Sequence, residues 1–251
     1  MKIAVLVYGM YREFDYAVKS WDYLFDLDCD FYFSLWNISK KTHVPTYCDI
    51  VKPVTSDMIL KHIPNAKISL LNEDDLDVSI PVSNKMVHHW VNGLNMIKNS
   101  EIKYDIIMLV RPDSYFFIKI PTDNVNYFNK KNVIYGTQGT FISSELHYVT
   151  EDRFLMGDFE TISEFITTID ARKNIYKSIH HYISDSLFEN RFSFVQIGGI
   201  VVSVLRPNFI LLDQNNVTHN QLEEKIHEWE NPKIPINYLD NHPLNYKIVN
   251  K

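Results

Sequence analysis

The chain has 251 residues and a mass of 29.6 kDa, which suits one large domain with a substantial core. Hydrophobic residues make up 45% of it and charged residues 22%, a composition that excludes an intrinsically disordered chain. The formal charge is 25 − 31 = −6, so no overall positive field exists to gather nucleic acid. We therefore expect no nucleic-acid partner.

Several sequence signatures are absent. Cys29 and Cys48 form neither a CxxC pair nor a zinc-type spacing, which favours a reducing compartment. Every apolar stretch falls short of the roughly 20 residues that cross a bilayer, and the apolar start lacks a small-residue cleavage site. Neither GxGxxG nor GxxxxGK[ST] occurs. We expect a cytoplasmic protein without a transmembrane segment.

Apolar patterning predicts strands that alternate with helices. Residues 2–10 form a continuous apolar run, typical of a central parallel strand, and a helix at 15–27 and an aromatic strand at 30–36 complete a β-α-β unit. In the next part of the chain we predict a strand at 50–54, a helix at 56–63, a strand at 67–71, a helix at 83–100 and a strand at 104–110. The last part has predicted strands at 132–136 and 151–157, predicted helices at 159–169 and 179–189, and an apolar run at 196–205. The alternation predicts an α/β fold with an open, mostly parallel sheet, helices on both faces, and one domain over 1–251.

Three predicted strands end in segments that carry ligand-binding residue types. Gly9 and Arg12 follow the first strand, Asn37 follows the second, and Arg111 and Asp113 follow a later buried strand. Because ligands of open α/β sheets bind outside the carboxyl ends of the strands, we expect these residues to converge. Asp113 could ligate a divalent cation that bridges a diphosphate, and Arg111 and Arg12 could bind phosphate. The alternatives are a local Arg/Asp pair that closes a turn and a solvated Arg12.

Further candidates lie at one helix start and in the second half of the chain. Asn84 and Lys85 open a predicted helix, where the helix N-terminus and a cation could both face an anion. Asp152 and Arg153 flank an apolar strand, and Asp185 lies on the helix predicted at 179–189. The two carboxylates could supply a general base or a metal ligand. The alternatives are an ordinary first helical turn and solvated surface positions.

In chain order, the segments KIAVLVYGMYREF, SNKMVHHWVNGLNMIKN and YDIIMLVRPDSYFF resemble a family of polysaccharide- and lipopolysaccharide-synthesis glycosyltransferases with a GT-A-like fold. In that family the first strand closes with Gly and Arg, a helix opens with an Asn-Arg-Gln-like step, and a later strand ends in Arg-x-Asp. The corresponding residues are Gly9, Arg12, Asn84, Lys85, Arg111 and Asp113. The resemblance spans residues 1–190.

The resemblance implies transfer of a sugar from a nucleotide-diphosphate sugar to a hydroxyl of a glycan or glycolipid acceptor. Residues 1–118 would form the nucleotide-binding half and residues 119–251 the acceptor-side half. Asp113 would contact the donor, Asp152 or Asp185 would act on the acceptor as a base, and Arg153 would bind substrate.

One departure from the usual GT-A pattern concerns the metal. Arg111, Pro112 and Asp113 stand where Asp-x-Asp is usual, so one carboxylate replaces two. If the reaction uses Mn²⁺ or Mg²⁺, Asp113 is the expected ligand.

Two other function classes fit part of the sequence. A sugar-1-phosphate nucleotidyltransferase shares the α/β layout, although it would need a more glycine-rich loop than Gly9 to Arg12. A non-catalytic carbohydrate-binding module derived from a transferase would explain the missing second carboxylate.

Overall fold

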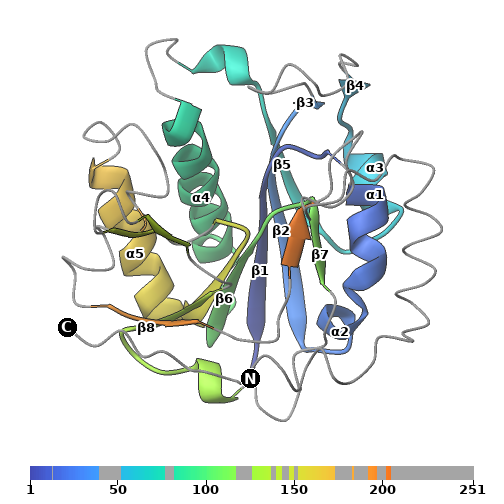
Figure 1. Cartoon of the computed structure of the whole chain (residues 1–251). Coiled ribbons are helices and arrows are strands. Elements are labelled where there is room, and N and C mark those ends of the chain that lie inside the picture. The colour runs from blue at the N-terminus through green and yellow to red at the C-terminus, as the bar shows by residue number, and fades with distance from the viewer. Residues whose placement is uncertain are drawn as a thin grey trace, which may run out of the picture.

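A seven-stranded mixed sheet forms the centre of the protein (Figure 1). The computed structural model describes residues 1–12, 14–39, 52–76, 82–116, 126–136, 140–142, 147–149, 152–172, 183, 192–196 and 202–204. The sheet order is β12-β8-β11-β6-β1-β2-β5, and β11 alone runs opposite to the other six strands. The strands are β1 (Ile3–Gly9), β2 (Cys29–Trp36), β5 (Lys67–Leu71), β6 (Ile106–Val110), β8 (Val133–Gly136), β11 (Phe154–Asp158) and β12 (Ser193–Gln196).

Helices and three short strand pairs complete the described part of the chain. The α-helices are α1 (Phe14–Ala17), α2 (Asp22–Phe25), α3 (Ser56–Leu60), α4 (Val82–Lys98) and α5 (Phe159–Arg172), and the 3-10 helices are η1 (Val18–Ser20) and η2 (Glu73–Asp75). The antiparallel pairs are β3 (Ile38–Ser39) with β4 (Lys52–Pro53), β7 (Ser114–Phe116) with β13 (Val202–Val204), and β9 (Thr140–Ile142) with β10 (His147–Val149). None of the described helices is both long enough and apolar enough to cross a bilayer.

Both faces of the sheet are buried, as the continuous apolar sequence of β1 predicts. The odd-numbered residues from Ile3 to Val7 pack with Trp21 and with α1, α2 and α3. The even-numbered residues from Ala4 to Tyr8 pack with Trp90 of α4 and with α5. In Figure 1, α4 and α5 lie on one side of the sheet and α1 to α3 on the other. The structure confirms an α/β fold with a mostly parallel sheet and helices on both faces.

Two predicted elements differ in the structure. The helix predicted at 15–27 is divided into α1, η1 and α2, because Trp21 leaves the helical conformation (φ −92°, ψ 14°). The buried Trp21 indole instead donates from Nε1 to the Ser114 carbonyl at 2.8 Å. Within the strand predicted at 50–54, β4 covers Lys52–Pro53, which pairs with β3 outside the main sheet, and Val54 lies beyond its end. The helix predicted at 179–189 lies outside the described residues except for Ile183.

Gly93 lets α4 lie directly on β1. A Cβ atom at this position would stand 2.1 Å from Cδ1 of the fully buried Leu6. We expect Gly93→Ala to lower the free energy of unfolding by about 1–3 kcal/mol through overpacking, although alanine is the better helix former by about 1 kcal/mol. Urea denaturation measures the difference, and Asn95→Ala, an exposed position on the same helix, should leave stability equal or higher. A Gly93→Ala protein as stable as the parent would contradict the close contact.

Candidate functional site

The site lies where the strand order reverses around β1. From β1 the chain builds outward through β2 to β5, and it then returns through α4 to β6 on the other side of β1. Val7 pairs with Val110, so the carboxyl ends of β1 and β6 lie at the same level. Such a switch point leaves a crevice at the carboxyl ends of the strands, which is the usual ligand site of open α/β sheets.

The backbone after β1 turns sharply at the switch point. Gly9 has φ 101°, a conformation that suits glycine, and Arg12 has φ 41°, which is uncommon for a residue with a side chain. This turn carries Arg12 across to the segment that follows β6. As a result, two of the three segments predicted to converge do so through their side chains.

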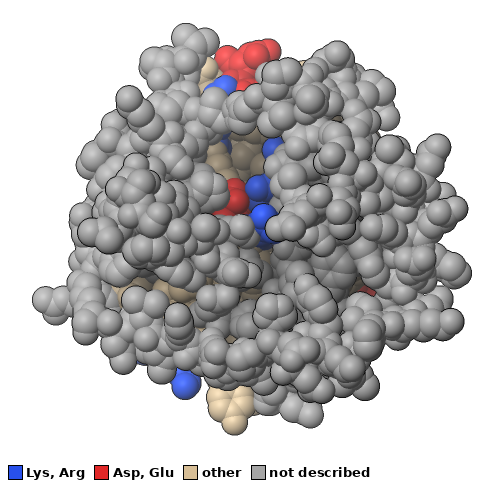
Figure 2. Space-filling view, viewed as in Figure 1, with Lys and Arg blue, Asp and Glu red and all other residues tan. Residues whose placement is uncertain are grey.

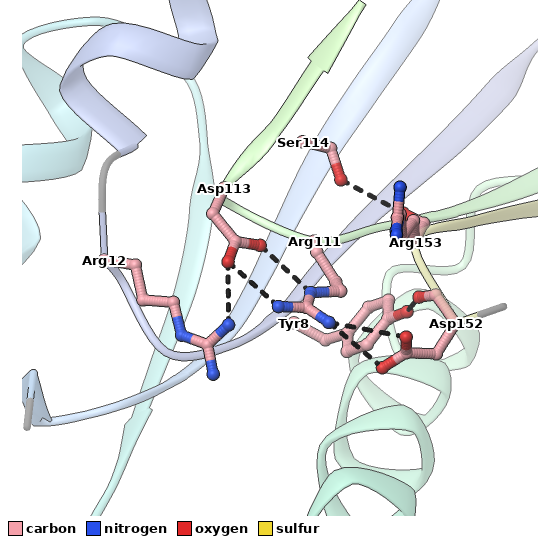
Figure 3. A network of polar contacts seen from close by, with 7 residues as sticks. All are labelled: Tyr8, Arg12, Arg111, Asp113, Ser114, Asp152 and Arg153. Atoms are coloured by element: carbon pink, nitrogen blue, oxygen red, sulfur yellow. Dashed lines mark hydrogen bonds and ion pairs between the residues drawn. The ribbon is translucent and has the colours of Figure 1, made fainter. Parts of the chain in front are cut away.

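Four charged side chains, Arg12, Asp113, Arg111 and Asp152, form an alternating chain of ion pairs (Figure 3). Arg111 binds Asp113 in a bidentate manner, with Nε to Oδ1 and Nη2 to Oδ2 both at 2.9 Å. Arg12 donates from Nη1 to the same Oδ2 at 2.7 Å. Arg111 also donates from Nη1 to the two oxygens of Asp152, at 3.3 and 3.4 Å. Asp113 is therefore shared by two arginines, and Arg111 by two aspartates.

The inner part of this chain is removed from solvent. The Asp113 side chain is 0% exposed and that of Arg111 is 14% exposed. Burial by itself lowers the pKa of Arg111, but the charges of Asp113 and Asp152 outweigh it and raise the pKa above its ordinary value. Arg111 therefore stays charged and fixed in position.

Backbone groups at the start of β11 hold the network in place. The Arg153 carbonyl accepts hydrogen bonds from the Arg111 N–H at 3.3 Å and from Ser114 Oγ at 3.1 Å. The hydroxyl of Tyr8 donates to the Asp152 carbonyl, and burial raises the pKa of Tyr8 well above its ordinary value, so the phenol keeps its proton. Because β11 is antiparallel, its N-terminal end lies beside the carboxyl ends of β1 and β6.

A cavity of about 150 Å³ opens above this network. It is smaller than the ~300–1,000 Å³ of typical ligand pockets, so it fits part of a ligand such as a phosphate or sugar unit. Figure 2 shows a hollow in this face with Lys or Arg atoms and acidic atoms inside it. The described lining residues are Tyr8, Gly9, Met10, Arg12, Trp36, Glu73, Lys85, Met86, His89, Arg111, Pro112, Asp113 and Asp152.

The α4 wall of the cavity adds a second ion pair and a neutral histidine. Lys85, in the first turns of α4, is bonded to Glu73. His89 is fully buried, with Nδ1 3.0 Å from Ser34 Oγ and its ring centroid 4.1 Å from that of Trp36. Burial lowers the pKa of His89 to about 3, so the ring is uncharged at neutral pH.

The structure brings most of the predicted site residues together. Those that line the cavity are Gly9, Arg12, Lys85, Arg111, Asp113 and Asp152. Asn37 instead holds the sheet through its backbone, since its N–H donates to the Leu71 carbonyl and its carbonyl accepts from Val54. Arg153 contributes its carbonyl to the network. The Asn84 side chain and Asp185 lie outside the described residues.

Sequence patterning missed several lining residues, among them Tyr8, Trp36, Glu73, Met86 and His89. Tyr8 and Trp36 end apolar strands, and His89 lies on the apolar face of α4, so each reads as an ordinary core position. Of these five residues, only Tyr8 and Trp36 could have been found from the sequence, because they lie near the carboxyl ends of predicted strands.

The residues at Asp113 do not fit a divalent cation. A hard cation needs carboxylate lone pairs, but Oδ1 accepts from Arg111 and Oδ2 accepts from both Arg111 and Arg12. Two guanidinium groups at hydrogen-bonding distance would also repel a cation. Within the described ranges, no group of three or more His, Cys, Asp or Glu side chains is arranged to hold a metal ion.

Comparison with known proteins identifies no relative: no protein-family model matches this chain, and no curated protein matches its sequence.

Proposed function

We propose that the protein is a glycosyltransferase that moves a sugar from a nucleotide-diphosphate sugar to a hydroxyl of a glycan or glycolipid acceptor. The observation that carries the proposal is the cavity at the β1/β6 switch point, with the Arg12, Asp113, Arg111 and Asp152 chain in its wall. Its position matches the general ligand site of open α/β sheets, and its residues suit a diphosphate and a sugar.

The leaving group of this reaction is a nucleoside diphosphate, which gains negative charge as the glycosidic bond breaks. Arg12 and Lys85 bring cations to the cavity wall from β1 and α4, so charge that develops between them is stabilised by groups already in place. Arg111 is more deeply held and keeps Asp113 and Asp152 in position.

Asp152 is the carboxylate best placed to activate the acceptor hydroxyl. Asp113 is fully buried and accepts three hydrogen bonds of 2.7 to 2.9 Å, whereas Arg111 contacts the Asp152 carboxylate at the longer distances of 3.3 and 3.4 Å. A general base must reach the proton that it removes, and Asp152 lines the cavity. We assign Asp152 to the acceptor side.

A carbohydrate-binding module without catalysis is the second candidate. The described cavity wall holds three cations, Arg12, Lys85 and Arg111, and three carboxylates, Glu73, Asp113 and Asp152. This balance gives a neutral lining, which also suits an uncharged sugar. The two candidates differ in whether a nucleoside diphosphate is released.

The test is a thermal-shift screen with uridine, guanosine, cytidine and thymidine diphosphate sugars, followed by an assay for released nucleoside diphosphate. At 100 times its dissociation constant a ligand stabilises the fold by about 2.7 kcal/mol, which is readily detected. We expect Asp152→Asn to keep binding and to lower release by about 10²–10⁴-fold.

Asp22→Asn, an exposed carboxylate on α2, is the control and should change neither quantity. Binding of free sugars with no nucleotide-sugar binding would favour the module, and no binding of any nucleotide sugar would refute the transferase.

A further inference from the structure

Asp113 is bonded so that it holds two arginine side chains in position. Its three acceptor contacts, at 2.7 to 2.9 Å, come from Arg111 and Arg12, and its side chain is fully buried. A carboxylate held in this way fixes the planes of two guanidinium groups. Its carboxylate oxygens accept from the two arginines, which leaves it poorly suited to a divalent cation.

Arg12 is held in place at a cost in backbone strain. Its φ of 41° lies in the left-handed region, where a side chain is disfavoured and glycine is not. Such residues persist where surrounding contacts over-determine them, and they cluster at ligand sites. Here the contact is the 2.7 Å bond from Nη1 to Asp113, which sets the guanidinium in the cavity wall.

Arg12 lies in the cavity wall with 19% of its side chain exposed. Arg111, the second arginine on Asp113, is 14% exposed and also joins Asp113 to Asp152. A planar guanidinium binds phosphate oxygens through directed N–H donors and carries a permanent charge. Arg12 therefore offers directed N–H donors to the oxygens of a diphosphate at this wall of the cavity.

We infer that the diphosphate of the ligand is neutralised by Arg12, oriented by Asp113, without a divalent cation held on Asp113. The inference rests on the proposed function, because it concerns the diphosphate of the same nucleotide sugar. It assigns Arg12 to ligand binding and Asp113 to positioning.

The test is titration calorimetry of the full chain with uridine and guanosine diphosphates and with inorganic pyrophosphate, in EDTA and again with Mn²⁺ or Mg²⁺. We expect binding in EDTA, with no gain in affinity on adding metal. Arg12→Gly should weaken binding about 10- to 100-fold, the effect of losing a charged hydrogen-bond partner. Arg12→Lys should recover part of that loss.

Arg12→Gly removes the guanidinium and relieves the positive φ, but it also takes one cation from the buried Asp113, so its melting temperature is recorded beside its affinity to confirm that the variant is folded. The matched control is Glu101→Gly, because Glu101 also has a positive φ, 58°. Glu101 precedes the amino end of β6, whereas the cavity lies at the carboxyl end of this strand. This control should leave diphosphate affinity unchanged. Asp113→Asn should lower affinity in both EDTA and metal, whereas a purely structural role would lower the melting temperature alone.

Binding that appears only with Mn²⁺ or Mg²⁺ would overturn this inference and leave the transferase proposal standing. Unchanged affinity in Arg12→Gly would likewise overturn the inference alone. Failure of every diphosphate and nucleotide sugar to bind, with or without metal, would overturn both.

Discussion

Arg111→Met is expected to lower the free energy of unfolding by about 3–5 kcal/mol, the usual cost of removing one partner from a buried ion pair. Methionine keeps much of the volume but takes the shared cation from Asp113, which is fully buried, and from Asp152. Urea denaturation monitored by circular dichroism measures the loss. The control is Lys61→Met, since Lys61 pairs with Asp15 at the surface with 52% of its side chain exposed.

The surface control should cost less than about 1 kcal/mol, because solvent screens exposed pairs. Adding Asp113→Asn to Arg111→Met should restore part of the lost stability, since a neutral amide is cheaper to bury than a carboxylate. An Arg111→Met protein that loses no more than the Lys61 control would show that the network is not a buried electrostatic unit.

The protein should lose stability steeply as the pH falls below about 6.5, because His89 is folded in its neutral form. Burial, with a smaller effect of the nearby His88, lowers the folded-state pKa of His89 to about 3, against 6.5 in the unfolded chain, while Glu73 opposes the shift. Between these values the unfolded chain binds more protons, so the free energy of unfolding falls as pH falls. The slope approaches roughly 1.4 kcal/mol per pH unit and sums to about 5 kcal/mol over the interval.

His89→Asn should flatten this acid limb. Its Oδ1 can accept the Ser34 hydroxyl that His89 Nδ1 contacts at 3.0 Å, and it does not titrate. His62→Asn is the control, because His62 is partly exposed and should leave the steep limb in place. Urea denaturation at a series of pH values gives the curves, and an unchanged acid limb in His89→Asn would contradict the buried neutral histidine.

The elements that sequence patterning predicts best are those with the strongest burial. Strand β1 is apolar on both faces and α4 repeats its apolar residues at helical spacing, so their positions follow from composition and period alone. The strand predicted at 50–54 is present as β4 over Lys52–Pro53, but its pairing with β3 outside the main sheet could not be predicted, because a short apolar run does not show which strand it will pair with.

In the candidate site, too, some residues could be predicted from the sequence and others could not. Arg12, Arg111 and Asp113 were found because they follow buried strands, and strand ends are visible in a sequence. The contact between Arg111 and Asp152 was not visible, because it depends on β11 pairing antiparallel with β6 across 41 residues of chain. Likewise, no local sequence pattern joins Lys85 to Glu73, which lies 12 residues earlier in the chain.

The reversed direction of β11 gives the two sides of the cavity different tolerance to evolutionary change. Arg12 and Arg111 follow the carboxyl ends of β1 and β6, so the strands that precede them in the chain set their positions. Asp152 lies two residues ahead of Phe154, the first residue of β11. Insertions and deletions upstream of Asp152 therefore leave it in register with β11, so the chain length before this carboxylate can vary without moving it from the cavity wall.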